Sequence, residues 1–191
     1  MKNLRHLITG TLMVVLSMLS ATSFAQTKYT LAASPVLKVT GGSTLHDWEM
    51  VSSSAQGEGM FVMEAGQLKG IPSLKVEMPA ETLKSGTKGL DSNAYKALKT
   101  SQHKQVKFVL KELTGSGTNY QAKGDFTIAG VTKSASFPVK LTPAGDKLTF
   151  EGSYATKLTN FSVEPPTALM GTVKTKDDIT IHFKTTFQPT K

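Results

Sequence analysis

The sequence predicts an all-β fold, a single antiparallel barrel of about eight strands with one short α-helix. Three observations lead to this prediction. Apolar and polar residues alternate with a period of two in most of the chain, which is typical of strands with one buried face. Short glycine-containing segments separate consecutive alternating runs. Only one segment has apolar residues at helical spacing, so the chain lacks the helical crossovers that parallel strands need.

Residues 1–25 have the composition of a secretory signal peptide, removed before the domain folds. Lys2 and Arg5 give a positively charged start, and residues 7–19 form an uncharged, mostly apolar run. This run is shorter than the roughly 20 apolar residues that a membrane-spanning helix needs. We therefore expect a cleaved leader and a periplasmic protein.

The expected cleavage site lies between Ala25 and Gln26, because Ser23 and Ala25 place small residues at the −3 and −1 positions. Residues 26–191 are then expected to form one barrel domain. Removal of the leader lowers the formal charge from +8, because Lys2 and Arg5 leave with it. The chain contains no cysteine, which excludes disulfides, thiolate metal sites and thiol nucleophiles.

The alternating runs predict the positions of the strands. In the clearest run, at the C-terminus, Ile179, Ile181, Phe183 and Phe187 alternate with polar residues. The expected strands, in chain order, cover residues 28–32, 36–40, 57–68, 73–78, 106–113, 120–128, 137–141, 148–154 and 179–187.

Three short segments predict tight reversals between consecutive strands. They are Gly115-Ser116-Gly117, Ala129-Gly130 and Ala144-Gly145-Asp146, and each contains residues that tolerate positive φ. Strands joined in this way form an antiparallel meander. The one helix is expected at residues 90–99, where Leu90, Ala94, Ala97 and Leu98 fall on one stripe and Asp91 or Ser92 can cap the start.

A small barrel with apolar inward rows can enclose a slender hydrocarbon chain. Alternation does not show which face is the interior, and a membrane barrel would turn its apolar rows outward. Charge and glycine at Gly57-Glu58-Gly59 and at Lys75-Val76-Glu77 would be costly on a lipid-facing row. Few aromatic residues remain to build two interfacial girdles once Phe24 is removed with the leader. These features favour an apolar interior.

The chain resembles the YceI-like family over nearly the whole of residues 26–191. Two strings are distinctive together: Ser43-Thr44-Leu45-His46-Asp47-Trp48, and Thr127-Ile128-Ala129-Gly130-Val131-Thr132-Lys133. Further matching segments lie at residues 93–98, 106–108, 161–166 and 177–183. The resemblance implies an exported, lipocalin-like antiparallel barrel whose interior holds a long isoprenoid-type lipid.

His46 and Asp47 invite an acid–base interpretation, since an imidazole titrates near neutral pH and a carboxylate can orient it. Adjacent strand residues point to opposite faces, however, so turn hydrogen bonds are the simpler interpretation, with Trp48 plugging the barrel. His46, His103 and His182 have no metal-ligand spacing, so we expect neither metal nor cofactor.

The excess of lysine does not predict nucleic-acid binding, because the lysines are scattered and no aromatic RNA-reading motif is present. A basic rim could instead favour anionic lipid head groups and transient contact with a membrane surface. Residues 161–171 contain Pro165-Pro166 followed by apolar residues. Leu169 and Met170 are expected there either in a lid that touches a ligand or in a plug that seals the core.

The leading hypothesis is a non-enzymatic carrier, store or stress-protective protein that encloses an isoprenoid-type or quinone-type lipid. One alternative is a module with a filled core that acts through a protein partner; another is a hydrolase that uses His46 and Asp47. The ligand-contacting residues expected on inward rows are Trp48, Phe108, Phe126, Phe150, Phe161 and Phe183.

Overall fold

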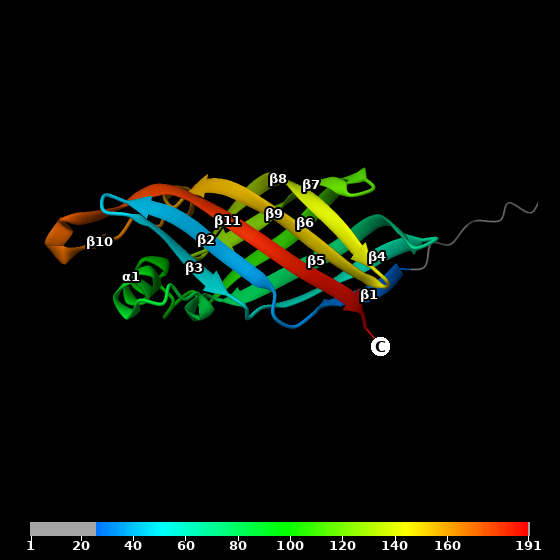
Figure 1. The fold of residues 1–191 in the computed structure, drawn as a ribbon, viewed down its shortest axis with the longest axis horizontal. Coiled ribbons are helices and arrows are strands. Elements are labelled where there is room, and N and C mark those ends of the chain that lie inside the picture. Colours follow the sequence, from blue (N-terminus) through cyan, green and yellow to red (C-terminus); the bar gives the residue numbers. More distant parts are fainter. Residues whose placement is uncertain (1–25, 191) are drawn as a thin grey trace, which may run out of the picture.

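The structure, a computed structural model, describes residues 26–190 and contains a closed antiparallel barrel of eight strands (Figure 1). β1 pairs with both β4 and β11, which closes the sheet on itself. In order around the barrel the strands are β1 (Gln26–Leu31), β4 (Gln56–Glu64), β5 (Gln67–Pro79), β6 (Gln105–Ser116), β7 (Asn119–Ile128), β8 (Val131–Ala144), β9 (Lys147–Lys157) and β11 (Val173–Pro189). The predicted signal peptide lies outside the described residues.

A further hairpin, β2 (Val36–Ser43) and β3 (Asp47–Ser52), extends the barrel wall beyond the eight strands. β2 pairs with β11 from Thr175 to Lys184, whereas β1 pairs with β11 from Phe187 onward. The two strands therefore follow one another along the same edge of β11. The two-residue β10 (Thr167–Ala168) pairs with the start of β11.

The helix α1 (Lys88–Leu98) completes the wall beside β3. The edge of β3 away from β2 makes a single β-bridge, between Val51 and Lys84 in the segment before α1. Leu90 and Ala94 of α1 pack near this bridge on a small cluster of buried residues, Met50, Met78 and Leu83. α1 is the only α-helix among residues 26–190, and none of the helices described there is long and apolar enough to cross a bilayer.

The start of α1 differs from the sequence prediction. The residue before the helix is Thr87, which makes no side-chain cap, and Asp91 lies within the first turn. The carboxylate of Asp91 accepts hydrogen bonds from the backbone N–H and the hydroxyl of Ser85, at 2.8 and 2.7 Å. Asp91 therefore ties the helix to the preceding loop. The helix ends at Leu98, because the next residue, Lys99, has a left-handed φ of 52°.

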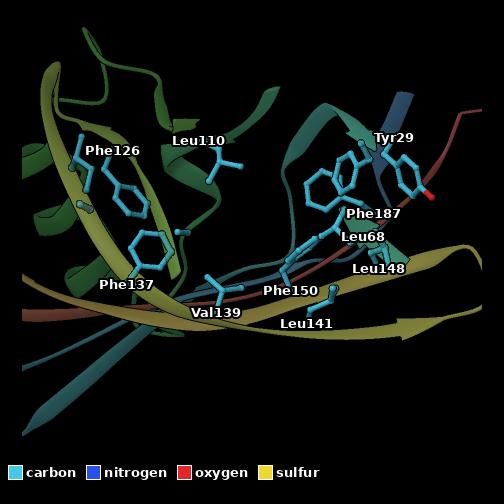
Figure 2. Close-up of a cluster of buried hydrophobic side chains, with 14 of the residues drawn as sticks. Tyr29, Leu68, Leu110, Phe126, Phe137, Val139, Leu141, Leu148, Phe150 and Phe187 are labelled. Atoms are coloured by element: carbon cyan, nitrogen blue, oxygen red, sulfur yellow. The ribbon is translucent and has the colours of Figure 1, made fainter. Parts of the chain in front are cut away.

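The end of the barrel nearest β1 is filled by aromatic side chains (Figure 2). Tyr29 stacks on Phe61 with ring centroids 4.4 Å apart, and Phe187 lies 5.7 Å from Phe61. Phe61, Phe187 and Leu148 are almost completely buried. Burial, and secondarily the nearby Asp146, raises the pKa of the Tyr29 hydroxyl. This end of the barrel is a solid core.

Every expected strand overlaps an observed one, but β8 and β11 each begin six residues before the predicted strands, and the region from β3 to β5 differs. The prediction of one strand over residues 57–68 is wrong, because a turn at Ala65 and Gly66 divides β4 from β5. Consecutive apolar residues from Met60 to Met63 concealed this turn. β3 was not predicted, although Trp48, Met50 and Ser52 alternate with the less buried Asp47, Glu49 and Val51. The reversal predicted at Ala129-Gly130 is confirmed, with φ of 49° and 79°.

Replacing Phe187 with alanine tests the packing of the closed end. A buried phenylalanine truncated to alanine typically costs about 3–5 kcal/mol, because the contacts around it cannot fully collapse. We expect Phe187→Ala to lower the free energy of unfolding by this amount in a urea titration. Val36→Thr, at a half-exposed position on β2, should change it by roughly 0.5 kcal/mol or less. A loss below about 1 kcal/mol for Phe187→Ala would contradict the described packing.

Replacing Asp91 with asparagine tests how α1 is held. The Ser85 hydrogen bonds lower the pKa of the Asp91 carboxyl in the folded protein. A folded pKa below the unfolded one gives stability at neutral pH that is lost as the pH falls through the folded pKa. Asp91→Asn should therefore lower the melting temperature at pH 7, and its difference from the wild type should shrink between about pH 5 and pH 2.

Ser85→Ala is the matched control, because it removes the hydroxyl donor and keeps the backbone donor. Its melting temperature at pH 7 should lie between those of the wild type and Asp91→Asn. If Asp91→Asn lowered the melting temperature by the same amount at pH 7 and at about pH 2, the carboxylate charge would not be what holds the helix.

Candidate functional site

The barrel encloses a cavity of about 1190 Å³. This exceeds the roughly 300–1,000 Å³ of pockets that hold drug-sized molecules. The lining comes mainly from the inward apolar rows of the strands. These residues include Leu74, Val76 and Met78 of β5, Phe108 and Leu110 of β6, Phe126 and Ile128 of β7, Phe137 and Val139 of β8, Phe150 of β9, and Ile179, Ile181 and Phe183 of β11.

Several inward side chains have part of their surface facing the cavity. Phe108, Ile181 and Phe183 face the interior, yet each is only half-buried. Their neighbours in the same rows, Leu110 and Phe187, also border the cavity but are buried. The oily interior is thus packed solid near β1 and hollow further along the barrel.

A second aromatic group lines the hollow part. Phe108 lies 4.8 Å from Phe126 between ring centroids, and Phe137 lies 5.6 Å from Phe183. Figure 2 places Phe126 and Phe137 on one side and the group around Phe150 and Phe187 on the other, with Leu110 and Val139 between them. Val139 therefore lies between the hollow part of the barrel and its closed end.

Two glycines of the wall lie directly beneath rings of this group. A Cβ atom on Gly124 would come 2.5 Å from Cζ of Phe108, and one on Gly152 would come 2.7 Å from Cζ of Phe183. No side chain larger than hydrogen fits there without displacing the ring. The glycines let both rings lie close to the wall, so the lumen stays wide.

α1, the β2–β3 turn and β10 gather at the end of the barrel opposite β1 (Figure 1), and the cavity lining extends to this end. Its lining there includes Leu90 and Asn93 of α1, Leu45 of the turn, and Leu169 and Met170 after β10. Leu45 is 68% exposed, Leu169 is 72% exposed, and Met170 is fully exposed. We call this end the mouth.

Five of the six predicted ligand-contacting residues border the cavity: Trp48, Phe108, Phe126, Phe150 and Phe183. Trp48 lies over Gly41 of β2, and its indole N–H donates to the Gly42 carbonyl at 3.0 Å. It forms part of the wall. The sixth residue, Phe161, belongs to the short helix η2 (Thr159–Phe161), is 1% exposed, and packs in the core outside the lining.

Sequence reasoning missed one part of the lining, the wall formed by β2, β3 and α1. Leu37, Val39 and Met50 border the cavity there. The helix contributes its predicted apolar stripe to the lining. The alternation of Val39 with polar neighbours in β2, and of Met50 in β3, was the signal that could have found this wall.

Residues 161–171 divide into two parts with different roles. Phe161 and Val163 are buried, so this part packs into the main core of the barrel. Leu169 and Met170 project at the mouth, so the expectation that they seal the core is wrong. The backbone reversal around them carries their side chains outward instead of back over the sheet.

The hydrogen bonds of His46 belong to a turn. The hydroxyl of Ser43 donates to the backbone carbonyl of His46 at 2.8 Å and accepts from its N–H at 3.1 Å. Nδ1 of His46 lies 2.8 Å from the backbone oxygen of Asp47, not from its carboxylate. A nucleophile–base pair is therefore not formed by these three residues. No group of three or more potential metal ligands occurs within residues 26–190.

Comparisons with known proteins agree with this architecture. A family model described as the YceI-like domain matches residues 20–187. No curated protein sequence matches the chain. Among solved structures, Burkholderia cenocepacia BcnA superposes with a TM-score of 0.65 at 19% identity, covering 80% of this chain and 95% of that one.

Two further structures share the fold. A polyisoprenoid binding domain from Saccharophagus degradans, implicated in plant cell wall breakdown, has a TM-score of 0.65 at 11% identity, covering 85% of this chain and 98% of that one. The Campylobacter jejuni YceI protein has a TM-score of 0.57 at 15% identity, with coverages of 71% and 81%. With the closed barrel and the match over residues 20–187, the chain belongs to the YceI-like family.

Proposed function

We propose that this protein binds a long-chain apolar lipid, of isoprenoid or quinone type, inside the barrel and serves as a periplasmic carrier, store or stress-protective reservoir. The observation that carries the proposal is the cavity of about 1190 Å³ with apolar walls and a mouth at one end. The Saccharophagus degradans neighbour, titled a polyisoprenoid binding domain, supports the same ligand class.

Binding would come from burial of the chain. Apolar surface removed from water contributes ~25 cal/mol per Å², so each 100 Å² of enclosed chain gives roughly 2.5 kcal/mol before the costs of association. A long flexible chain supplies much such surface and needs few polar contacts. The walls offer what this ligand requires.

The polar groups of the interior also fit an apolar chain. The buried hydroxyl of Thr185 borders the cavity and donates to the Phe150 carbonyl at 3.5 Å. No buried side-chain nitrogen or oxygen in the described residues lacks a hydrogen-bond partner. The depth of the cavity therefore makes no demand for a polar group on the ligand. A polar head group would lie at the mouth, near Asn93 and His46.

The alternatives fit the site less well. A module with a filled core would have interlocking side chains throughout, whereas Phe108 and Phe183 border open space. A hydrolase using His46 and Asp47 would need a hydrogen bond between the imidazole and a nucleophile or the carboxylate, and Nδ1 meets a backbone carbonyl instead. We therefore propose a binding protein and not an enzyme.

The proposal includes export. Residues 1–25 would act as the signal peptide, and residues 26–191 would form the mature barrel domain.

A bulky substitution at Val139 tests the proposal, because it fills part of the cavity. Val139 points into the cavity, whereas Lys140, the next residue of β8, is exposed on the outer face. Protein expressed from the full chain is purified without detergent and its organic extract is analysed by mass spectrometry. We expect a long-chain lipid near one per protein in the wild type and in Lys140→Trp. We expect about a tenfold loss in Val139→Trp, because the indole occupies the space of the chain.

Circular dichroism establishes that each variant is folded, and Val76→Trp, on the opposite wall strand β5, replaces Val139→Trp if the latter does not fold. A wild-type protein that yields no lipid and takes up no added polyprenol would overturn the proposal. Equal lipid content in Val139→Trp and Lys140→Trp would place the ligand outside the cavity.

A further inference from the structure

The mouth of the cavity carries a cluster of exposed apolar side chains. In the described part of the chain, four large apolar residues are strongly exposed: Val36, Leu45, Leu169 and Met170. The last three border the mouth, although they come from segments more than 120 residues apart. We call Leu45, Leu169 and Met170 the apolar tip. Isolated exposed residues are ordinary, but a cluster at the entrance of a cavity indicates a contact surface.

Hydrogen bonds hold the two segments of the tip together. The backbone N–H of Thr44 donates to the Lys174 carbonyl at 2.9 Å, and the N–H of Lys174 donates to the Thr44 hydroxyl at 3.1 Å. The Thr44 hydroxyl also approaches the Thr172 carbonyl, at 3.5 Å. Leu45 is thus fixed beside the β10–β11 connection, and the tip is one surface.

The backbone of the tip is strained in a way that exposes its side chains. Leu169, Met170 and Gly171 have φ of 50°, 55° and 88°, in the left-handed region that residues other than glycine rarely adopt. The carbonyl of Leu169 accepts hydrogen bonds from the N–H and the hydroxyl of Thr172, at 3.2 and 2.8 Å. Strain of this kind concentrates at functional sites, where the surrounding structure maintains it.

Positive charge lies next to the tip. Lys174 and Lys176 are exposed at the start of β11, and Lys176 lies alongside Gly42 of β2. No acidic residue occurs from Pro165 to Lys176, and Asp177 and Asp178, which follow, both pair with Lys157. The carboxylate of Asp47 lies by Gly42, as Lys176 does. Within residues 26–190 neither lysine forms an ion pair, whereas wall lysines such as Lys28 pair with carboxylates.

We propose that the apolar tip inserts into the surface of an anionic lipid bilayer, with Lys174 and Lys176 on the phosphate head groups. Apolar side chains flanked by lysines are the combination that binds the interface of anionic membranes. A projecting, fully exposed Met170 fits a deformable lipid surface. Docking would bring the mouth against the bilayer, so a chain could pass between membrane and cavity without crossing water. This purpose, though not the docking itself, rests on the proposed function.

Vesicle sedimentation tests the docking. Purified protein is mixed with vesicles of phosphatidylcholine alone or with 30% phosphatidylglycerol, and bound protein is measured in the pellet. We expect binding to the anionic vesicles that weakens as salt is raised, because salt screens the lysines. Leu169→Ser with Met170→Ser should weaken it about tenfold or more, since the inserted apolar area is lost. Lys174→Gln with Lys176→Gln should also weaken it.

Val36→Ser is the matched control, because it removes an exposed apolar side chain far from the mouth and should leave vesicle binding unchanged. Absence of wild-type binding to both kinds of vesicle would overturn the proposal, as would an equal loss in Val36→Ser. A dimer in analytical ultracentrifugation that the serine variants dissociate, without vesicle binding, would assign the tip to a second copy of the chain and overturn it too.

The lipid extract distinguishes this test from that of the proposed function. The Lys174→Gln, Lys176→Gln variant should retain the wild-type lipid content, because neither lysine borders the cavity. Vesicle binding by a protein that holds no lipid would sustain the docking and refute the carrier. Lipid in the cavity without vesicle binding would do the reverse.

Discussion

Strand β11 determines both how the barrel closes and where its cavity opens. It has 17 residues, long enough to pair with β9 on one edge and with β1 and then β2 on the other. Where β1 meets it, the sheet closes around Phe61 and Phe187, and the interior is solid. Where β2 replaces β1, β3 has a single bridge to Lys84 on its far side, and the apolar face of α1 completes the wall. The hollow is the consequence of this exchange of partners along one strand.

Much of the fold follows from local pattern. The alternating rows of β7, β8, β9 and β11 specify strands whatever surrounds them, and Ala129-Gly130 specifies a reversal by its backbone conformation alone. β3 escaped prediction because it is short and follows a polar turn around Ser43. The β4–β5 turn escaped because Met60 to Met63 continue the apolar run up to it.

The site was predictable in kind but not in detail. The aromatic residues Phe108, Phe126 and Phe183 were assigned to inward rows, and they border the cavity. Phe161 is the same type of residue but lies in the solid core. Whether a buried ring contacts protein or open space depends on distant strands, which the local sequence does not specify. Met50 and the apolar face of α1 border the cavity because of how β3 and the helix meet, a relation between segments that no local pattern contains.

The glycines beneath Phe108 and Phe183 affect the width of the cavity from positions that do not themselves border it. Because Gly124 and Gly152 have no side chain, the rings of Phe108 and Phe183 can lie against the backbone and do not project further into the cavity. Any redesign of the width of the cavity would therefore have to begin in the backbone of β7 and β9. Exchanging the rings alone would leave those glycines in place.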